Sequence, residues 1–289
     1  MKIGIVGLGL IGGSIGRATV KKTDHIVYAY DRDESALEKG ALLNAYHEVL
    51  TKDNAKEIDL LLICVYPDGV EGVLKEYVPI VKPGAIVMDC VGIKRPVCAL
   101  MEDYSDKYPD VSFVGGHPMA GREFSGVEHA TAGLFDHATV LIVPVHTPIE
   151  ALVSVKEFFL GIGADGLVPT TAEEHDRIIA YTSQLAHVVS AAYITSPTAK
   201  SHYGFSAGSF RDMTRVARLN PAMWTDLMDK NADFLSEEIF SFAERMQRFG
   251  KAIQEKDKEA LFALLFESNE TKLDVEKNRL QKRNDAMKK

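Results

Sequence analysis

Three glycines near the N-terminus are spaced to receive a phosphate group. Gly7, Gly9 and Gly12 form the pattern G-x-G-x-x-G, with Leu10 and Ile11 between the last two. The pattern follows an apolar run and precedes a helical segment. In that context the first glycine makes a tight turn, the second lets a pyrophosphate approach the backbone, and the third allows a helix to pack closely on a strand. We predict a dinucleotide-binding loop; the alternative is glycine-rich packing without a cofactor.

Two further pairs of residues follow apolar runs where a cofactor is expected. Asp31 and Arg32 come at the end of the second run, 19 residues past Gly12. A carboxylate there accepts the ribose hydroxyls of NAD and repels the 2′-phosphate of NADP, so Asp31 favours NAD, although Arg32 can hold such a phosphate. Tyr66 and Pro67 follow the third run, and we expect them beside the cofactor; a simple turn explains them equally well.

A histidine stands in a glycine-rich stretch after the fifth apolar run. Residues 115–121 read GGHPMAG and contain His117 and Pro118. We expect a rigid loop at the cofactor edge of a sheet. The imidazole would take a hydroxyl proton there as hydride leaves the same carbon, because its pKa lies near the working pH. The alternative is a hydrogen-bonded structural histidine.

Polar side chains repeat at helical spacing in the C-terminal half. Ser183, His187 and Ser190 fall at i, i+4 and i+7, so they share a helix face that either lines a site or meets water. Three arginines follow a similar spacing: Arg211, Arg215 and Arg218. Guanidinium groups match carboxylates, so this cluster in an acidic chain indicates an anionic substrate; the alternative is a solvated, salt-bridged face.

Six apolar, β-type runs must position the N-terminal residues. They cover residues 2–7, 25–31, 59–65, 85–91, 111–116 and 139–145, with helical stretches between them. Such runs are typical of strands buried on both faces of a parallel sheet, and the alternation predicts an α/β fold with a doubly wound, Rossmann-type sheet.

Helices replace the β-type runs after about residue 170. We expect one helix over 170–194, another from the cap Asn220 to Gly250, and a last one capped by Asp257, with a basic, solvated tail at 277–289. The predicted domains are 1–167, a Rossmann NAD-binding domain, and 168–289, an all-α domain for substrate binding and dimerisation. The apolar content of these helices exceeds what a small bundle hides, which indicates a homodimer.

Composition excludes several classes of protein. The 289 residues carry a net charge of −8, which argues against a nucleic-acid partner. No apolar run reaches the ~18–20 residues of a membrane helix, and the glycine spacing favours a strand and turn over a signal peptide. Cys64, Cys90 and Cys98 form neither a metal-ligand spacing nor an even disulfide set, so we expect a reduced, cytoplasmic protein without a metal.

Four motifs together resemble the prephenate dehydrogenase family. They are GLGLIGGS at 7–14, GGHPMAGREFSG at 115–126, SQLAH at 183–187 and FRDMTRVA at 210–217, and the resemblance covers almost the whole chain. It implies a homodimer with an N-terminal Rossmann domain and an α-helical dimerisation domain. It also implies oxidative decarboxylation of prephenate to 4-hydroxyphenylpyruvate with reduction of NAD.

The resemblance also implies roles for single residues. His117 resembles the histidine that binds the ring 4-hydroxyl and takes its proton, and Arg215 resembles the arginine that binds a substrate carboxylate. His187 matches the helix histidine near the substrate side chain, with Ser183 one turn before it. Glu123 matches an acidic residue that serves in gating and ion pairing at the site.

One segment departs from the family pattern D-x-x-S-x-K. Residues 89–94 read DCVGIK, so Lys94 remains, as a candidate substrate-binding residue, while Gly92 replaces the serine that orients the catalytic histidine. Another hydroxyl or a water takes that role, or the enzyme is slower by about ten- to a hundredfold.

Other functions stay open at this point. The nearest is arogenate dehydrogenase, although the charge of Arg122 favours the more anionic prephenate. Another oxidoreductase of the same architecture is a second, and a non-catalytic, dinucleotide-binding regulatory protein, which Gly92 suggests, is a third. We expect no regulatory module after the helical domain, and we therefore expect tyrosine, if it inhibits, to compete in the substrate site.

Overall fold

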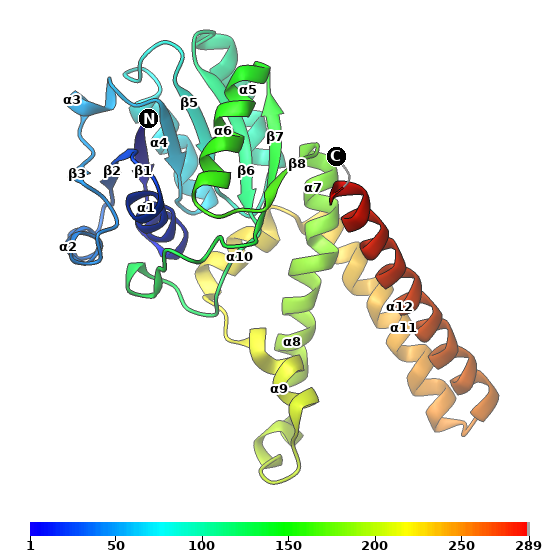
Figure 1. Cartoon of the computed structure of the whole chain (residues 1–289). Coiled ribbons are helices and arrows are strands. Elements are labelled where there is room, and N and C mark those ends of the chain that lie inside the picture. Colours follow the sequence, from blue (N-terminus) through cyan, green and yellow to red (C-terminus); the bar gives the residue numbers. More distant parts are fainter. Residues whose placement is uncertain (288–289) are drawn as a thin grey trace. The chain divides into compact units, whose positions relative to one another are not determined.

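Eight strands form one sheet in the computed structural model, which describes residues 1–287 (Figure 1). The strand order is β3-β2-β1-β4-β5-β6-β7-β8. The strands are β1 Lys2–Val6, β2 Ile26–Tyr30, β3 Glu48–Val49, β4 Leu60–Ile63, β5 Ile86–Asp89, β6 Ser112–Pro118, β7 Thr139–Val145 and β8 Gly166–Pro169. The predicted doubly wound α/β fold is confirmed.

All six predicted runs are strands, but the expectation of a purely parallel sheet is wrong for the sixth. The strands from β3 to β6 pair in parallel, whereas β7 pairs antiparallel with β6 and parallel with β8. A parallel return needs a crossover, usually a helix. The connection from β6 to β7 holds only the short 3-10 turn Val127–His129, so the chain comes back in the opposite direction.

Helices cover both faces of the sheet, and each face has its own apolar core. The helices of this part are α1 Leu10–Lys22, α2 Glu34–Leu42, α3 Lys52–Ala55, α4 Val70–Tyr77, α5 Arg95–Lys107 and α6 Ile149–Gly161. Side chains of α4 and α5 pack in one buried cluster, and those of α1 and α6 pack in the other. The strand ends between the two layers are therefore held on both sides.

The C-terminal part is helical, as predicted, with two differences in detail. Its helices are α7 Ala172–Ile179, α8 Ala186–Ile194, α9 Gly208–Thr214, α10 Pro221–Asp229, α11 Ala232–Gln254 and α12 Lys258–Met287. The expected helix over 170–194 contains a π-helical segment, Ala180–Leu185, between α7 and α8. The expected helix from Asn220 to Gly250 is two helices, because α10 ends at Asp229.

Two of the three predicted helix ends agree with the structure. Asn220 Oδ1 accepts from Met223 N–H at 3.2 Å, and Asp257 Oδ1 accepts from Ala260 N–H at 2.9 Å, so both predicted caps are confirmed. The prediction that Gly250 ends the helix is wrong. The helix α11 ends instead at Gln254, and Lys256, two residues further on, takes a left-handed φ of 55°. A glycine inside an exposed helix costs only about 1 kcal/mol, which is too little to end it.

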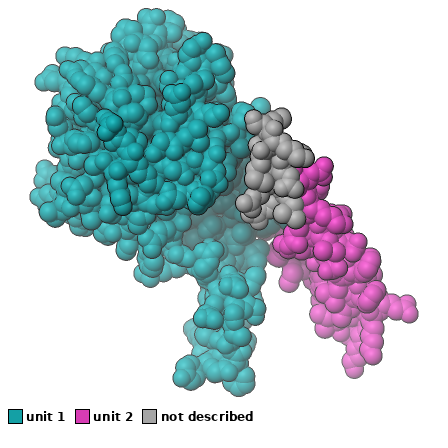
Figure 2. Space-filling model, in the orientation of Figure 1, with its two compact units in different colours: residues 1–235 teal, residues 236–289 magenta. Residues whose placement is uncertain are grey.

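The chain forms two compact units, Met1–Leu235 and Ser236–Lys289, which are coloured separately in Figure 2. The first unit holds the sheet and α7 to α10; the second holds most of α11 and all of α12. The predicted domain boundary at residue 167 stays a prediction. In the basic tail predicted at 277–289, the side chains of residues 279, 280 and 282–289 lie outside the described part of the chain. Within residues 1–287, none of the helices combines the length and the hydropathy of a membrane span.

Candidate active site

The glycine loop between β1 and α1 has the geometry that a dinucleotide phosphate requires. Gly7 has a φ of +100°, and a Cβ there would lie 2.5 Å from the carbonyl oxygen of Cys64. A Cβ at Gly12 would lie 1.9 Å from the carbonyl oxygen of Gly7, so this position must also be glycine. At Gly9 nothing lies within 4 Å of the Cβ position. The tight turn, the open side and the close helix contact therefore fit the group that the sequence predicts.

Asp31 lies beside this loop at the end of β2. Its Oδ2 accepts from Leu8 N–H at 2.6 Å, and its Oδ1 accepts from Asp33 N–H at 2.9 Å. The carboxylate thus ties the glycine loop to the strand, and each oxygen keeps a lone pair for a further donor. The neighbouring Arg32 is exposed.

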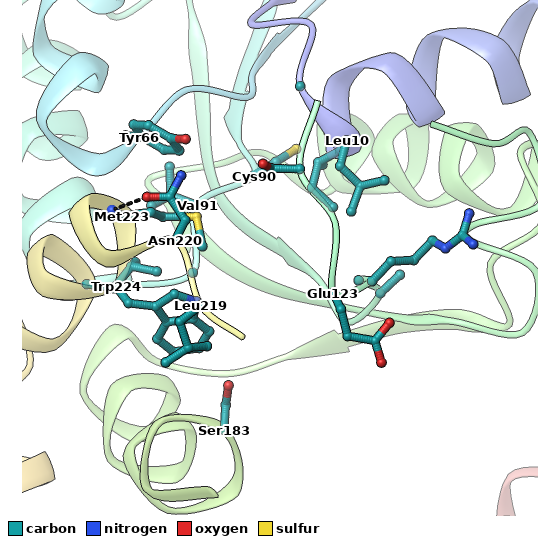
Figure 3. Close-up of a pocket in the computed structure, with 18 of the residues that line it drawn as sticks. Leu10, Tyr66, Cys90, Val91, Glu123, Ser183, Leu219, Asn220, Met223 and Trp224 are labelled. Carbon is teal, nitrogen blue, oxygen red and sulfur yellow. Dashed lines mark hydrogen bonds between the residues drawn. The ribbon is translucent and has the colours of Figure 1, made fainter. Parts of the chain in front are cut away.

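A cavity of about 810 Å³ brings most of the predicted residues together (Figure 3). It lies within the first compact unit, between the carboxyl ends of the strands and the helices α8 and α10. The predicted residues that line it are Gly9, Leu10, Ile11, Tyr66, Pro67, His117, Arg122, Glu123, Ser183, His187 and Arg215. Those outside its lining are Gly7, Gly12, Asp31, Arg32 and Lys94.

His117 lies within β6, so the expected loop is wrong. The residue pairs with Leu141 of β7, and the strand continues to Pro118. The preceding glycines serve close packing instead of a loop, because a Cβ at Gly116 would lie 2.2 Å from Met88 Cε. A strand between two others holds the imidazole more firmly than a loop does.

The pKa of His117 lies well below its usual value. Burial is the largest cause, and the nearby His175 and Lys94 act in the same direction. The imidazole is therefore neutral near pH 7, which is the form that accepts a proton. Its Nδ1 lies 2.9 Å from His175 Nε2 in the core, and its other nitrogen faces Gly92 and the cavity.

Gly92 leaves space beside the second ring nitrogen of His117. A Cβ at residue 92 would lie 3.9 Å from His117 Nε2 and 3.5 Å from the nearest atom of Leu227. Nothing there would be displaced, so a serine hydroxyl would reach the imidazole. The glycine thus opens this edge of the ring to a ligand in the cavity.

Lys94 is buried and does not face the cavity, so the structure does not support its predicted contact with substrate. Its ammonium pairs with the Asp89 carboxylate, and the two side chains are 1% and 0% exposed. Asp89 also accepts from Val91 N–H at 2.8 Å and from Gly116 N–H at 3.1 Å. Lys94 therefore acts on the site through its charge, which lowers the pKa of His117.

Two members of the predicted polar helix face line the cavity, and the third does not. His187 Nδ1 donates to the carbonyl oxygen of Ser183 at 2.8 Å, and its ring lies 4.0 Å from that of Trp224. Ser190 is buried and donates to the carbonyl oxygen of Met213 at 2.8 Å. The π-helical segment widens the turn at Ser183, which regular helical spacing does not anticipate.

An exposed ion pair stands at the mouth of the cavity. Arg215 Nη1 donates to Glu123 Oε1 at 2.8 Å, and this hydrogen bond lowers the pKa of Glu123. Arg122 and Arg218 also line the cavity, whereas Arg211 does not. The predicted helical spacing of the arginines is wrong, because α9 ends before Arg215. The described lining residues include three arginines and one residue with a carboxylate, Glu123, so the cavity suits an anion.

Sequence reasoning missed several residues of the site. Asn220, Met223 and Trp224 line the cavity at the start of α10, and Figure 3 shows Asn220 and Met223 beside Tyr66. The sequence predicts Asn220 only as a helix cap and indicates no role in the site for Met223 or Trp224. Their position directly after the arginine cluster was the available signal. His175 and Asp176, behind His117, were hidden in the predicted helix over 170–194.

Comparisons with known proteins agree with this geometry. The family model described as "Prephenate dehydrogenase, nucleotide-binding domain" matches residues 15–168, and that described as "Prephenate dehydrogenase, dimerization domain" matches residues 171–267. A cyclohexadienyl dehydrogenase of Zymomonas mobilis is 33% identical over 94% of this chain and 94% of that protein. A prephenate dehydrogenase of Bacillus subtilis is 30% identical over 89% of this chain and 71% of that protein.

A solved structure shares the fold. The prephenate dehydrogenase from A. aeolicus, in complex with hydroxyphenyl propionate and NAD+, has a TM-score of 0.82 and 24% sequence identity, with 95% of this chain and 98% of that chain covered. The two family models together cover most of the sequence, in the order of the two structural parts described above. The chain therefore belongs to the prephenate dehydrogenase family of oxidoreductases.

Proposed function

We propose that this protein catalyses the oxidative decarboxylation of prephenate to 4-hydroxyphenylpyruvate with NAD. One observation carries the proposal: the neutral imidazole of His117 meets a cavity whose mouth holds the guanidinium of Arg215. Prephenate has a ring hydroxyl for the first group and carboxylates for the second. The family membership of the chain supports the same reaction.

His117 acts as the base in this proposal. Its Nε2 accepts the proton of the ring 4-hydroxyl while hydride leaves the same carbon. NAD, when bound at the glycine loop, supplies the nicotinamide that takes the hydride. The ring carboxylate then leaves as CO2, driven by aromatisation of the ring.

Arg215 binds a substrate carboxylate in the proposal. It can exchange Glu123 for that group at low cost, because both side chains are partly exposed and an exposed ion pair contributes little. His187 and Ser183 lie near the substrate side chain, where Trp224 and the Ser183 carbonyl hold the histidine ring. Arg122 adds positive charge next to Glu123, as a doubly anionic substrate requires.

We further propose NAD, rather than NADP, as the cofactor. The Asp31 carboxylate is fixed at the end of β2 beside the glycine loop, where it can accept ribose hydroxyls and repels a phosphate. Replacement of Asp31 by serine is expected to raise the efficiency with NADP relative to NAD. The measurement is kcat/KM for each cofactor at saturating prephenate.

A side-by-side assay tests the function. NADH formation, followed by absorbance, is measured with prephenate and with arogenate at equal concentrations. Higher kcat/KM with prephenate supports the proposal, and equal or higher kcat/KM with arogenate replaces it by arogenate dehydrogenase. Absence of NADH with both substrates would favour the non-catalytic alternative.

We also propose a cytoplasmic homodimer that assembles through the helical region. The second compact unit exposes apolar side chains, among them Phe240, Phe262, Leu265 and Phe266, and these four residues lie within the part of the chain, residues 171–267, that matches the dimerization-domain model. Light scattering is expected to give twice the chain mass.

Tyrosine, if it inhibits, is expected to raise the KM for prephenate and leave kcat unchanged.

A further inference from the structure

A chain of three side chains leads from the cavity into the core. His117 Nδ1 lies 2.9 Å from His175 Nε2, and His175 Nδ1 lies 2.6 Å from Asp176 Oδ1. His175 and Asp176 are the last two members, and they are 2% and 0% exposed. The proposed reaction described above uses neither of them.

The partners of Asp176 fix the direction of these hydrogen bonds. Its carboxylate accepts from the backbone N–H groups of Lys94 and Arg95, both at 2.8 Å, and from Arg95 Nε at 3.3 Å. A carboxylate that receives three hydrogen bonds from N–H donors serves as an acceptor in this network. His175 Nδ1 must therefore carry the proton that it shares with Asp176.

The protonation of His175 then sets that of His117. The pKa of His175 lies below its usual value, chiefly through burial, so the ring is neutral near pH 7. A neutral ring with its proton on Nδ1 offers a lone pair at Nε2. His117 must donate to that lone pair from Nδ1, which leaves its own Nε2 without a proton. This bare nitrogen is the one beside Gly92, at the cavity.

We propose that His175 and Asp176 are positioning residues that hold His117 in the one tautomer able to accept a proton from a ligand. This inference rests on the proposed function for the identity of the proton donor. It also explains how the base keeps its orientation although residue 92 is glycine.

The proton balance suits a buried chain. The O–H bond of the substrate breaks, the proton moves to His117 Nε2, and the C–H electron pair leaves as hydride. Decarboxylation returns an electron pair to the ring, and the product again carries a hydroxyl on the same carbon. The proton is therefore held and given back, so it needs no route to solvent.

Several charged groups face this chain, and they decide the sign of its pH response. Lys94, paired with Asp89, lies close to both histidines and opposes protonation of either ring. Arg95, at the start of α5, partly balances Asp176 and is itself bound to Asp233. Asp176 favours protonation of His175, the ring that it contacts. His175 and Lys94 both lower the pKa of His117, so the groups around this chain keep its imidazole neutral near pH 7.

The first test reads the tautomer directly, in the full chain and without substrate. In ¹⁵N-histidine NMR spectra at pH 7.5, assigned with the His117→Asn variant, His117 is expected to show a protonated Nδ1 and a bare Nε2. A protonated Nε2, or an equal mixture of tautomers, would overturn the proposal. This result decides the tautomer even if the wild-type protein oxidises neither prephenate nor arogenate, an outcome that would reject only the proposed function.

The second test separates orientation from charge with two variants. In His175→Gln the amide oxygen can still accept from His117 Nδ1, whereas His175→Phe offers no acceptor. We expect kcat to fall about tenfold in the first and about a hundredfold in the second, with the KM for prephenate and the Kd for NAD within about twofold of wild type.

His137→Gln is the matched control. His137 pairs with Asp165 through the same atoms at 3.0 Å, but on the surface and away from the cavity. It is expected to leave kcat and its pH profile unchanged. Equal losses of kcat in both His175 variants, or a loss that follows the Kd for NAD, would mean that His175 only packs, and would reject the proposal.

Discussion

The two sides of the cavity hold their charges in opposite ways. On the sheet side, Lys94 and Asp89 form an ion pair that is 1% and 0% exposed, directly behind His117. On the helical side, Arg215 and Glu123 form a pair that is 64% and 30% exposed. A buried pair is costly to separate, while an exposed pair exchanges partners easily. We therefore call the side with the buried pair behind His117 the fixed side. The side with the exposed pair, where Arg215 is expected to contact substrate, is the movable side.

The largest effect is expected from His117→Asn on the fixed side. Loss of the base should lower kcat by about a thousandfold, within the range for removal of a general base. Asparagine has a similar shape, and the glycine loop is untouched, so the Kd for NAD should stay within about twofold. Steady-state kinetics and fluorescence titration with NAD check both values. An unchanged kcat would remove His117 from the reaction.

Breaking the buried pair should affect stability before activity. Lys94→Met leaves the Asp89 carboxylate buried without its cation, which costs about 3–5 kcal/mol in the free energy of unfolding. Lys82→Met is the control, because its pair with Asp59 is about one-third exposed and should cost less than about 1 kcal/mol. Urea denaturation measures both. Equal losses would show that burial does not distinguish the two pairs.

On the movable side, Arg215→Ala should act on binding and leave the fold intact. We expect the KM for prephenate to rise by about ten- to a hundredfold, the value of a charge-assisted hydrogen bond of about 1.5–3 kcal/mol. The melting temperature should stay within about 1 °C of wild type, because the pair is exposed. Kinetics and thermal unfolding check the split. A loss of kcat at constant KM would contradict a role in ground-state binding.

Gly92→Ser tests whether the ring of His117 needs a hydroxyl at residue 92 to orient it. The added side chain fits, and its hydroxyl would reach the ring of His117. Since His175 already holds that ring, we expect kcat to change by less than about threefold. A gain of tenfold or more would show that the orientation of the base is incomplete in the natural sequence. Gly121→Ser, at an open position on the same cavity, is the control.

The smallest effect is expected from the pH response of the exposed pair. Arg215 lowers the pKa of Glu123, so the pair is complete above the ordinary pKa of a glutamate and is lost as the pH falls through the lowered value. Glu123→Gln should therefore leave the melting temperature at pH 7 unchanged. If protonation of Glu123 changes the KM for prephenate at acidic pH, that change should be absent in the variant. Kinetics at pH 4 to 7 compare the variant with wild type. A large loss of stability at pH 7 would contradict the exposed, exchangeable character of the pair.

The sequence by itself determined the features that neighbouring residues fix. The turn at Gly7, the close approach at Gly12 and the caps at Asn220 and Asp257 follow from the conformations and hydrogen bonds of a few consecutive residues. The apolar runs placed six strands for the same reason. Local patterns could not give the direction of β7 or the π-helical turn before His187, because neither depends on the composition of the segment alone.

Only the tertiary structure decided what surrounds the reactive group. His117 and His175 are 58 positions apart, and they meet because β6 and the start of α7 pack together. The same packing buries Lys94, which the motif had assigned to substrate, and leaves Arg215 exposed beside Glu123, 92 positions away. Burial sets the cost of a charge and the pKa of an imidazole, and it is a property of the folded chain, which residue order alone does not reveal.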